Sequence, residues 1–533
     1  MPHVDGIAIN ADDKLSSPDT TLRPQQSMRK RLVSLAAFVV AIGIVFCCCL
    51  RLASTIPTDS DGAGNILMAW AMLHGNVLLS GWRLTDVSFY LTELPEYMLI
   101  TAVRGVRPDV VQIGAAITYT LCALGAALLA KGAATGREGA LRAGLAIAIA
   151  LAPAAGDQRT LLTNPDHTGS AVPVLLLLLM LERPALRTRM PVIALVIVSV
   201  AAVSDEITLL IAVAPLVGLW LLRSRLASAL ADRRLERRLA AAACAAAVVG
   251  WAATQVIKAV GGWRTVAIPA TFVGFGGLAW NVREAIAGLL TLFDVRFAGQ
   301  SGWHTTLAVF HLIGLLLVVA AVVLGIRGIR AGDDRVASLL TLAVVIDFAA
   351  FILFIPSPQQ NYREIDVIVP LGAALAGRLL VGPLLRMRLQ WALAAVLAAC
   401  AVTFGFGLTQ ATRPPANAGL GSWLVQHHLT SGIAEYWAAD SLTADTGGAV
   451  QVLPVQLTGG RLTPNLWETD THWFDPRSHS ASFLIVSAPS GSDPHPMTRA
   501  EAIAALGAPW RTYSYQRDVI LVWQKNLLTQ VSP

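Results

Sequence analysis

The sequence predicts an α-helical polytopic membrane protein that carries a small α/β domain at its C-terminal end. Of its 533 residues, 55% are hydrophobic and only 14% are charged, and the mean hydropathy is +0.60. A soluble chain of this length has too little interior to bury so much apolar surface. The apolar residues gather in runs that suit a bilayer, and these runs stop near residue 409.

About eleven apolar runs are candidate membrane spans. They fall at 32–50, 109–130, 139–155, 169–182, 190–204, 206–222, 239–260, 304–326, 336–355, 365–381 and 390–408. Arginine and lysine cluster at 29–31, 131–142, 183–189, 223–238, 327–335 and 378–388, between alternate runs. Because cytoplasmic loops carry an excess of these residues, the N-terminus is expected inside and the C-terminal domain outside the cytoplasm.

Three regions follow from this organisation. Residues 1–27 are polar and contain Pro and Ser, so they are predicted to form a disordered cytoplasmic tail. Residues 28–410 are predicted to form the transmembrane domain, and residues 411–533 the extracytoplasmic α/β domain. The net charge of +6 does not indicate a nucleic-acid partner, because the basic residues lie in short clusters that set topology.

The first outer segment, residues 51–108, contains two apolar stretches that are too short or too interrupted to span. In residues 65–74, Ile66, Ala69, Trp70 and Leu73 recur at helical spacing, which indicates a helix lying in the membrane interface. Residues 95–106 are predicted to form a second interfacial helix.

The C-terminal region alternates between strand and helix patterns. Residues 450–453, 483–486 and 518–523 are predicted strands, since each is a short run rich in Val, Ile and Leu. Thr498 and Glu501 form a capping-box pattern that predicts the start of a helix.

Asp59 and Asp61 lie just outside the first span, in the stretch Thr58-Asp59-Ser60-Asp61-Gly62. A carboxylate at the bilayer surface must be hydrated, paired or bound to a metal. One of the two could remove the proton of an acceptor hydroxyl, or help to bind a cation that neutralises phosphate. The alternative is that both cap the helix that follows.

Other polar residues of the outer loops are also candidates. Glu93 and Glu96 flank Pro95 and could be metal ligands, or charges that favour a helix N-terminus. The short loop 156–168 is dense in polar residues, holding Asp157, Arg159, Asp166 and His167. Asp205 and Glu206 are expected in a structural turn between spans. His304 and His311 lie near the start of a span, where a lone histidine is more often satisfied by a hydrogen bond than bound to a metal.

Arg363 stands outside, directly before a span, in Asn361-Tyr362-Arg363-Glu364. A guanidinium there could hold a phosphate through a bidentate contact. Its alternative is an interfacial anchor formed together with Tyr362.

Several of these segments resemble motifs of one family. Asp61 is followed by Ala69-Trp70-Ala71-Met72-Leu73-His74-Gly75, then by Glu93-Leu94-Pro95-Glu96-Tyr97, and later by Tyr362-Arg363 before Val369-Pro370. They are similar to the early acidic residue, the A-x-x-M-L-x-x-G helix, the proline motif and the R-Y-x-x-P element of the GT-C superfamily. Members of that superfamily are membrane glycosyltransferases that use polyprenyl-phosphate sugars. Residues 411–533 resemble outer domains of some actinobacterial members.

The resemblance implies a role for four of the candidates: Asp61 would be the catalytic base, Glu93 a metal or substrate contact, Asp157 an acid of the second loop and Arg363 a phosphate contact. From their place in the outer loops, Asp59, Arg159 and His167 are further candidate substrate contacts. His304 joins Glu93 as a candidate ligand of a divalent cation, although the sequence leaves the cofactor unknown. The chain departs from the family pattern where Gly62 follows Asp61, where Leu94 replaces a lysine, and where Tyr362 and Arg363 stand in transposed order.

The resemblance also implies a reaction. A hexosyl or pentosyl group would pass from a polyprenyl-phosphate donor to a cell-envelope glycan or lipid acceptor, in contact with membrane lipid. The alternatives are a transporter or assembly factor for envelope glycolipids, and an inactive homologue whose C-terminal domain binds glycans. Transporters usually place charges at mid-bilayer, whereas here the charges gather in the outer loops, which favours the enzyme.

Overall fold

The structure is a computed structural model that describes residues 22–154, 160–163, 166–225, 233–266, 271–331, 334–354, 362–489 and 495–531. The chain divides into two compact units, Met1–Val45 and Phe46–Pro533. Helix α1 (Leu22–Ala53) holds the described part of the first unit. Residues 22–27, which belong to the predicted tail, form the first part of this helix, and Pro24 falls in its first turn, where proline is tolerated. The rest of that prediction, residues 1–21, lies outside the described residues.

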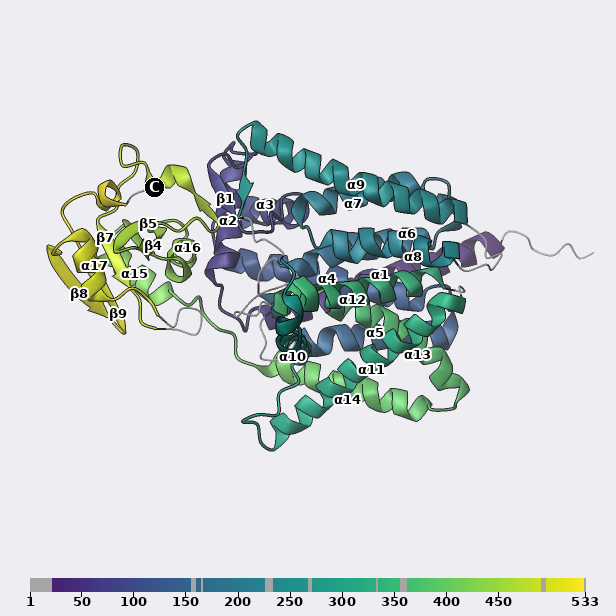
Figure 1. Cartoon of the computed structure of the whole chain (residues 1–533). Coiled ribbons are helices and arrows are strands. Elements are labelled where there is room, and N and C mark those ends of the chain that lie inside the picture. The colour runs from purple at the N-terminus through teal and green to yellow at the C-terminus, as the bar shows by residue number, and fades with distance from the viewer. Residues whose placement is uncertain are drawn as a thin grey trace, which may run out of the picture. The chain divides into compact units, whose positions relative to one another are not determined.

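The membrane part of the second unit is helical (Figure 1). Its helices are α2 (Ser60–Leu73), α3 (Glu93–Arg104), α4 (Asp109–Lys131), α5 (Gly136–Ala154), α6 (Ala171–Leu181), α7 (Met190–Ser204), α8 (Ala214–Arg225), α9 (Arg233–Ala259), α10 (Gly274–Leu292), α11 (Trp303–Ala331), α12 (Arg335–Phe354), α13 (Ile368–Arg386) and α14 (Gln390–Thr409). Two short 3₁₀ turns matter for the site, η2 (His167–Ser170) and η5 (Tyr362–Ile365).

The multi-pass character is confirmed, but the predicted count of about eleven spans is not exact. Among the described residues, seven helices are long and apolar enough to cross a membrane, and they include α1, α4, α9, α11, α12, α13 and α14. Helices α6, α7 and α8 are apolar but have only 11, 15 and 12 residues. At 1.5 Å per residue α6 is about 17 Å long, well short of a hydrocarbon core of about 30 Å.

Helix α4 connects two ends of the membrane domain. At one end Val111 packs against Gly62 of α2, where a Cβ would lie only 2.8 Å from its side chain. At the other end the carbonyl of Leu129 accepts a hydrogen bond of 2.6 Å from Arg378. Arg378 also forms 2.6 Å ion pairs with Glu182 and with Asp334. Segments predicted to face the cytoplasm therefore meet at one end of α4, and the first outer segment lies at the opposite end.

The first outer segment forms two helices, as its periodicity predicts. Helix α2 begins at Ser60, five residues before the predicted segment, because Asp59 caps it. Of the predicted apolar stripe, Ile66 and Ala69 are fully buried, whereas Trp70 and Leu73 are exposed. Helix α3 begins and ends two residues before the predicted helix 95–106.

The C-terminal domain is a three-layer α/β structure. Its elements are α15 (Ala418–Gln426), β3 (Ser431–Glu435), α16 (Tyr436–Asp445), β4 (Gln451–Thr458), β5 (Arg461–Pro464), β7 (Phe483–Val486), α17 (Arg499–Leu506), β8 (Arg511–Tyr515) and β9 (Asp518–Val522). The sheet order is β5-β4-β3-β7-β9-β8, with β3 parallel to β4 and β7 and the remaining pairs antiparallel. The three predicted strands and the capping box at Thr498 are confirmed.

The central strand β7 explains the layering. Phe483 and Ile485 pack with α15 and α16, whereas Leu484 and Val486 pack with α17 on the opposite face. All four residues are buried. A strand that is covered on both faces becomes a continuous apolar run, which is why its sequence does not alternate.

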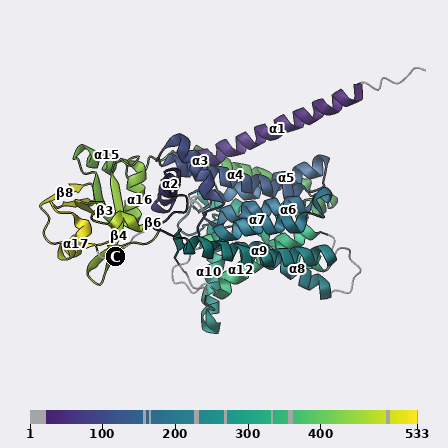
Figure 2. The same cartoon turned by 90° about the horizontal axis from the view of Figure 1, so that it is seen from above.

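The C-terminal domain docks on the first outer segment through two contacts. Helix α16 packs along α2, which both views show (Figures 1 and 2). In addition, β1 (Trp82–Leu84) pairs with β2 (Arg264–Thr265) on one side and antiparallel with β6 (Thr469–Asp470) on the other. The sequence pattern alone separated these parts at residue 410, but the structure joins them by a shared sheet.

Trp82 anchors this shared sheet. It is 1% exposed, and its ring meets Trp473 edge-on with centroids 5.1 Å apart. The backbone N–H and the hydroxyl of Thr471 both donate to the carbonyl of Gly81. Gly81 has φ of +84°, and a Cβ there would lie 2.5 Å from a carboxylate oxygen of Asp470. The close approach of the domain therefore requires glycine at this position.

This requirement predicts the effect of a substitution in the loop. Gly81→Ala should weaken docking of the C-terminal domain, because the methyl group combines a clash with a backbone conformation that costs about 1–2 kcal/mol for a non-glycine residue. Gly75→Ala is the matched control: Gly75 has φ of +101°, but no atom lies within 4 Å of the place that its methyl group would take. Thermal unfolding in detergent should show the larger loss for Gly81→Ala, and equal losses would contradict this explanation of docking.

Candidate functional site

The two aspartates at the start of α2 have different surroundings. Asp59 is the N-cap residue, and its Oδ1 accepts a hydrogen bond of 3.0 Å from the N–H of Gly62. Asp61 lies in the first turn, where the helix dipole favours a negative charge. Its carboxylate faces a small cavity and does not cap the helix. Of the two sequence hypotheses, capping thus describes Asp59, and Asp61 remains available for chemistry.

Arg363 bridges two segments of the site. Its Nη1 lies 3.2 Å from Oδ2 of Asp61, and its Nε lies 3.3 Å from Oδ2 of Asp166. Arg363 stands in η5, and Asp166 caps η2 by accepting a 2.9 Å hydrogen bond from the N–H of His167. The guanidinium therefore joins the start of α2 to the turns η2 and η5, which are far apart in the sequence.

These residues surround a cavity of about 60 Å³. Its lining comes from the first outer segment, from η2, from η5 and from the C-terminal domain: Asp61, Thr85, Asp86, Val87, Phe89, Asp166, His167, Arg363, Trp467 and Glu468. Three predicted site residues, Asp61, His167 and Arg363, are brought together here. Asp86, Trp467 and Glu468 were not predicted.

His167 holds the two loops beneath the cavity. It is 4% exposed, and its Nδ1 lies 2.8 Å from Asp205 while its Nε2 lies 3.0 Å from Glu364. The same oxygen of Asp205 accepts a 2.6 Å hydrogen bond from the hydroxyl of Ser170. Asp205 also accepts from the N–H of Ile207 at 2.9 Å, so it makes the expected structural turn and in addition supports the site.

Burial changes the charge of the carboxyl groups around Arg363. Desolvation raises the pKa of Asp86 to about 6, and desolvation together with the charge of Asp61 raises the pKa of Asp59 to about 7. Burial raises the pKa of Asp166 against the opposing effect of Arg363, and it raises the pKa of Glu468 well above its ordinary value. The cavity is consequently less negative near neutral pH than its carboxyl content suggests.

The C-terminal domain contributes directly to this network. The hydroxyl of Tyr436 lies 2.6 Å from Oδ1 of Asp61 and 3.2 Å from Oε2 of Glu468. Asn65 of α2 donates a 3.3 Å hydrogen bond to the other oxygen of Glu468. No local pattern marks Tyr436 or Glu468, because Tyr436 is 375 residues away from its partner Asp61.

Glu93 lies beside the cavity without lining it. It is 4% exposed, at the start of α3, and its carboxyl group lies against Gly169 of η2, where a side chain would collide with it. Glu96 lies one turn further along α3, with Oε2 3.3 Å from the hydroxyl of Thr118. The predicted substrate contact of Glu93 stays a prediction.

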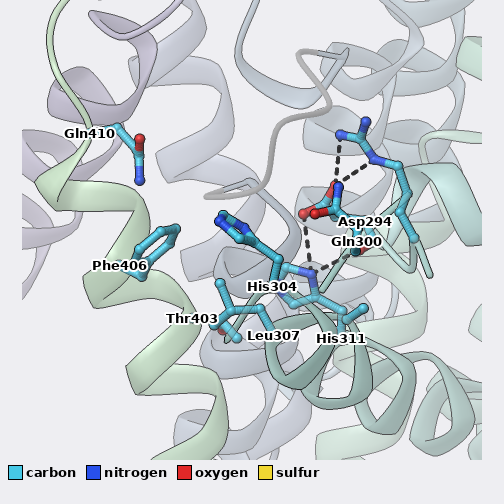
Figure 3. Close-up of a pocket in the computed structure, with 10 residues that line it drawn as sticks. Asp294, Gln300, His304, Leu307, His311, Thr403, Phe406 and Gln410 are labelled. Atoms are coloured by element: carbon cyan, nitrogen blue, oxygen red, sulfur yellow. Dashed lines mark hydrogen bonds and ion pairs between the residues drawn. The ribbon is translucent and has the colours of Figure 1, made fainter. Parts of the chain in front are cut away.

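His304 lines a different cavity, of about 280 Å³, between α11 and α14 (Figure 3). Its ring meets Phe406 edge-on at 5.9 Å. On the other side of the cavity, Asp294 is bonded by Arg296 at 3.1 Å and lies 3.3 Å from Nδ1 of His311, as the dashed lines in Figure 3 show.

The structure does not bring Glu93 and His304 together as ligands of one metal ion. Their described neighbours differ, and the part of the chain that the structure describes contains no group of three His, Cys, Asp or Glu residues that could hold a metal ion. The role of each residue as a metal ligand stays a prediction. Asp157 and Arg159, which were also predicted to contact substrate, lie outside the described residues.

Comparisons with known proteins identify the fold. No protein-family model matches the chain, and no curated protein matches it in sequence. Among solved structures, it is similar to ArnT from Cupriavidus metallidurans bound to undecaprenyl phosphate, with a TM-score of 0.55 and 14% identity over 94% of this chain and 99% of that one. The apo state of the same protein matches with a TM-score of 0.54 and 13% identity over 94% and 100%. This likeness confirms the predicted GT-C-like fold, and at such low identity it carries the fold alone.

The acidic pair in α3 predicts how stability depends on pH. Burial raises the pKa of Glu93 and of Glu96 to about 8, and the charge of Glu93 adds to the shift of Glu96. Between about pH 4.5 and pH 8 the folded protein holds these protons and the unfolded chain does not, so stability should fall as the pH rises through this range.

Thermal unfolding in detergent at pH 5, 6.5 and 8 tests this dependence. Glu93→Gln, which keeps the neutral form, should reduce the fall in unfolding temperature between pH 5 and pH 8. Glu138→Gln is the control, because Glu138 is an exposed partner of Arg142. A Glu93→Gln protein with the same pH dependence as the wild type would refute the assignment.

Proposed function

We propose that the protein transfers a sugar from a polyprenyl-phosphate donor to a hydroxyl group of a cell-envelope glycan or lipid outside the cytoplasm. The observation that carries this proposal is the Arg363 guanidinium bonded to both Asp61 and Asp166 at the edge of a small open cavity. In this arrangement the Asp61 carboxylate can act as the base, and the neighbouring Arg363 guanidinium can stabilise the negative charge of the leaving phosphate. The fold shared with ArnT bound to undecaprenyl phosphate supports the choice of donor.

The proposed reaction is a nucleophilic substitution at the donor sugar. The acceptor oxygen attacks the anomeric carbon of the donor sugar, and the bond from that carbon to the phosphate oxygen breaks. Asp61 takes the proton of the acceptor hydroxyl, and polyprenyl phosphate leaves with an additional negative charge. Arg363 stabilises that charge more strongly in the transition state than in the bound donor, which is what accelerates the step.

The buried acids around Arg363 favour this role. Because burial raises the pKa of Glu468 well above its ordinary value and also raises that of Asp166, an incoming phosphate meets less repulsion than fully ionised carboxylates would produce. His167 acts as a positioning residue, since its bonds to Asp205 and Glu364 fix the turns that carry Asp166 and Arg363.

Transfer measured in membranes tests the proposal. Membranes that contain the protein should pass radiolabelled sugar from at least one member of a panel of undecaprenyl-phosphate hexoses and pentoses to envelope material. Asp61→Asn should lower the rate by about 10²–10⁴-fold, as expected for loss of a general base. Arg363→Gln should weaken donor binding by about tenfold or more, since a charge-assisted contact to phosphate is lost.

Asp109→Asn is the matched control, because Asp109 is an aspartate at the start of α4 that pairs with Arg104 and does not line the cavity. It should transfer sugar at the wild-type rate. If Asp61→Asn folds stably and retains full transfer, Asp61 is not the base. If the wild-type protein transfers none of the panel and does not bind undecaprenyl phosphate, the proposed reaction is wrong.

A further inference from the structure

We propose that the C-terminal domain supplies the acceptor subsite of this enzyme, with Trp467 as the platform for a sugar ring of the acceptor and Glu468 as a hydrogen-bonding partner of its hydroxyl groups. This inference rests on the proposed function, since it assigns the acceptor side of the same cavity. The acceptor class that it names is a saccharide, and not a lipid alcohol that lacks a sugar.

Trp467 and Glu468 reach the cavity from the C-terminal domain. Both line the cavity that Asp61 and Arg363 also line, although they come from the loop after β5. Trp467 is half-buried, so part of its ring stays accessible. An aromatic face suits the apolar face of a sugar ring, and a neighbouring carboxyl group suits its hydroxyl groups.

The size of the cavity limits what can enter it. A volume of about 60 Å³ admits a few water-sized groups but not a complete sugar ring. The hydroxyl-bearing edge of a ring can therefore enter toward Asp61 while the body of the ring stays outside against Trp467. This arrangement presents one hydroxyl group to the base.

Glu468 is closely held in its place. Its side chain is 1% exposed, yet its backbone has φ of +49°, in the left-handed region that residues with a side chain rarely adopt. Phe89, which lines the same cavity, has φ of +51°. Such conformations cost free energy and persist where the surroundings impose them, often at functional sites.

The surroundings that hold Glu468 belong to α2. Asn65 donates to its carboxyl group at 3.3 Å, and Gly64 leaves the space that it fills, because a Cβ at Gly64 would lie within 3.0 Å of three of its side-chain atoms. Burial raises the pKa of Glu468 well above its ordinary value, which favours the protonated form of the carboxyl group, and that form can donate a hydrogen bond.

Tyr436 is the positioning residue of this subsite. Its hydroxyl lies between Asp61 and Glu468, at 2.6 Å and 3.2 Å, and its carbonyl accepts a 2.7 Å hydrogen bond from Ser60 of α2. One phenol therefore sets the separation between the base and the acceptor-binding carboxyl group. Because β6 also pairs with β1, the acceptor side of the cavity is fixed relative to the donor side.

The test separates acceptor binding from donor binding in the full-length protein in detergent. The probes are a panel of methyl glycosides of common hexoses and pentoses for the acceptor, and undecaprenyl phosphate for the donor. The variants are Trp467→Leu, Glu468→Ala, which removes the carboxyl group altogether, and Tyr436→Phe. The matched controls are Trp510→Leu, a largely exposed tryptophan of the same domain, and Tyr515→Phe.

At least one methyl glycoside should bind the wild-type protein, and Trp467→Leu and Glu468→Ala should weaken its binding by about tenfold while leaving undecaprenyl phosphate binding unchanged. Tyr436→Phe should lower the rate constant of transfer and shift its pH profile with little change in glycoside binding. The controls should match the wild type in both assays, and unfolding temperatures should verify that each variant is folded.

Each remaining outcome is decisive. If undecaprenyl phosphate binds but no glycoside does, or if Trp467→Leu and Glu468→Ala bind glycoside as the wild type does, the acceptor subsite is refuted while the proposed function stands. If neither the glycosides nor undecaprenyl phosphate bind the wild-type protein, the proposed function fails as well.

Discussion

The half-buried guanidinium of Arg363 is the group around which the site is organised. A cation in such a place needs anionic partners, and it finds Asp61 at the start of α2 and Asp166 at the start of η2. Those partners are in turn oriented by helix ends, since Asp61 lies in a first turn and Asp166 is a cap. The charge balance of one residue thus determines where two outer loops meet, and the cavity is the space left between them.

The docking of the C-terminal domain follows from a second constraint, the absence of side chains at particular positions of the first outer segment. Gly64 and Gly81 allow Glu468 and Asp470 to approach the backbone closely. The paired strands β1 and β6 and the packing of α16 on α2 then fix the domain by backbone hydrogen bonds and buried surface together. The C-terminal domain therefore also forms part of the cavity wall, through Trp467 and Glu468.

The similarity to ArnT concerns the path of the chain and not its sequence, since 14% of residues are identical over nearly the full length of both proteins. A fold of this kind fixes helices in the bilayer and presents loops at one end, and the chemistry depends on the side chains of those loops. In this chain the loops supply several buried carboxyl groups, one guanidinium and an imidazole held between two acids. The proposed reaction depends on these residues.

Local features of the sequence were enough to predict the membrane class, the two helices of the first outer segment, the α/β character of the C-terminal domain and the choice of Asp61, His167 and Arg363 as candidates. These follow from hydropathy, helical periodicity and charges placed in outer loops. The number of spans could not be predicted, because composition and run length do not separate a short apolar helix such as α6 from a full span. Only the folded structure determines that Asp59 is the cap and that Asp61 faces the cavity. It also determines that Trp467 and Glu468 line that cavity and that Tyr436 contacts Asp61. Contacts across some 375 residues depend on how strands β1 and β6 pair and where α16 packs, and no local pattern encodes either.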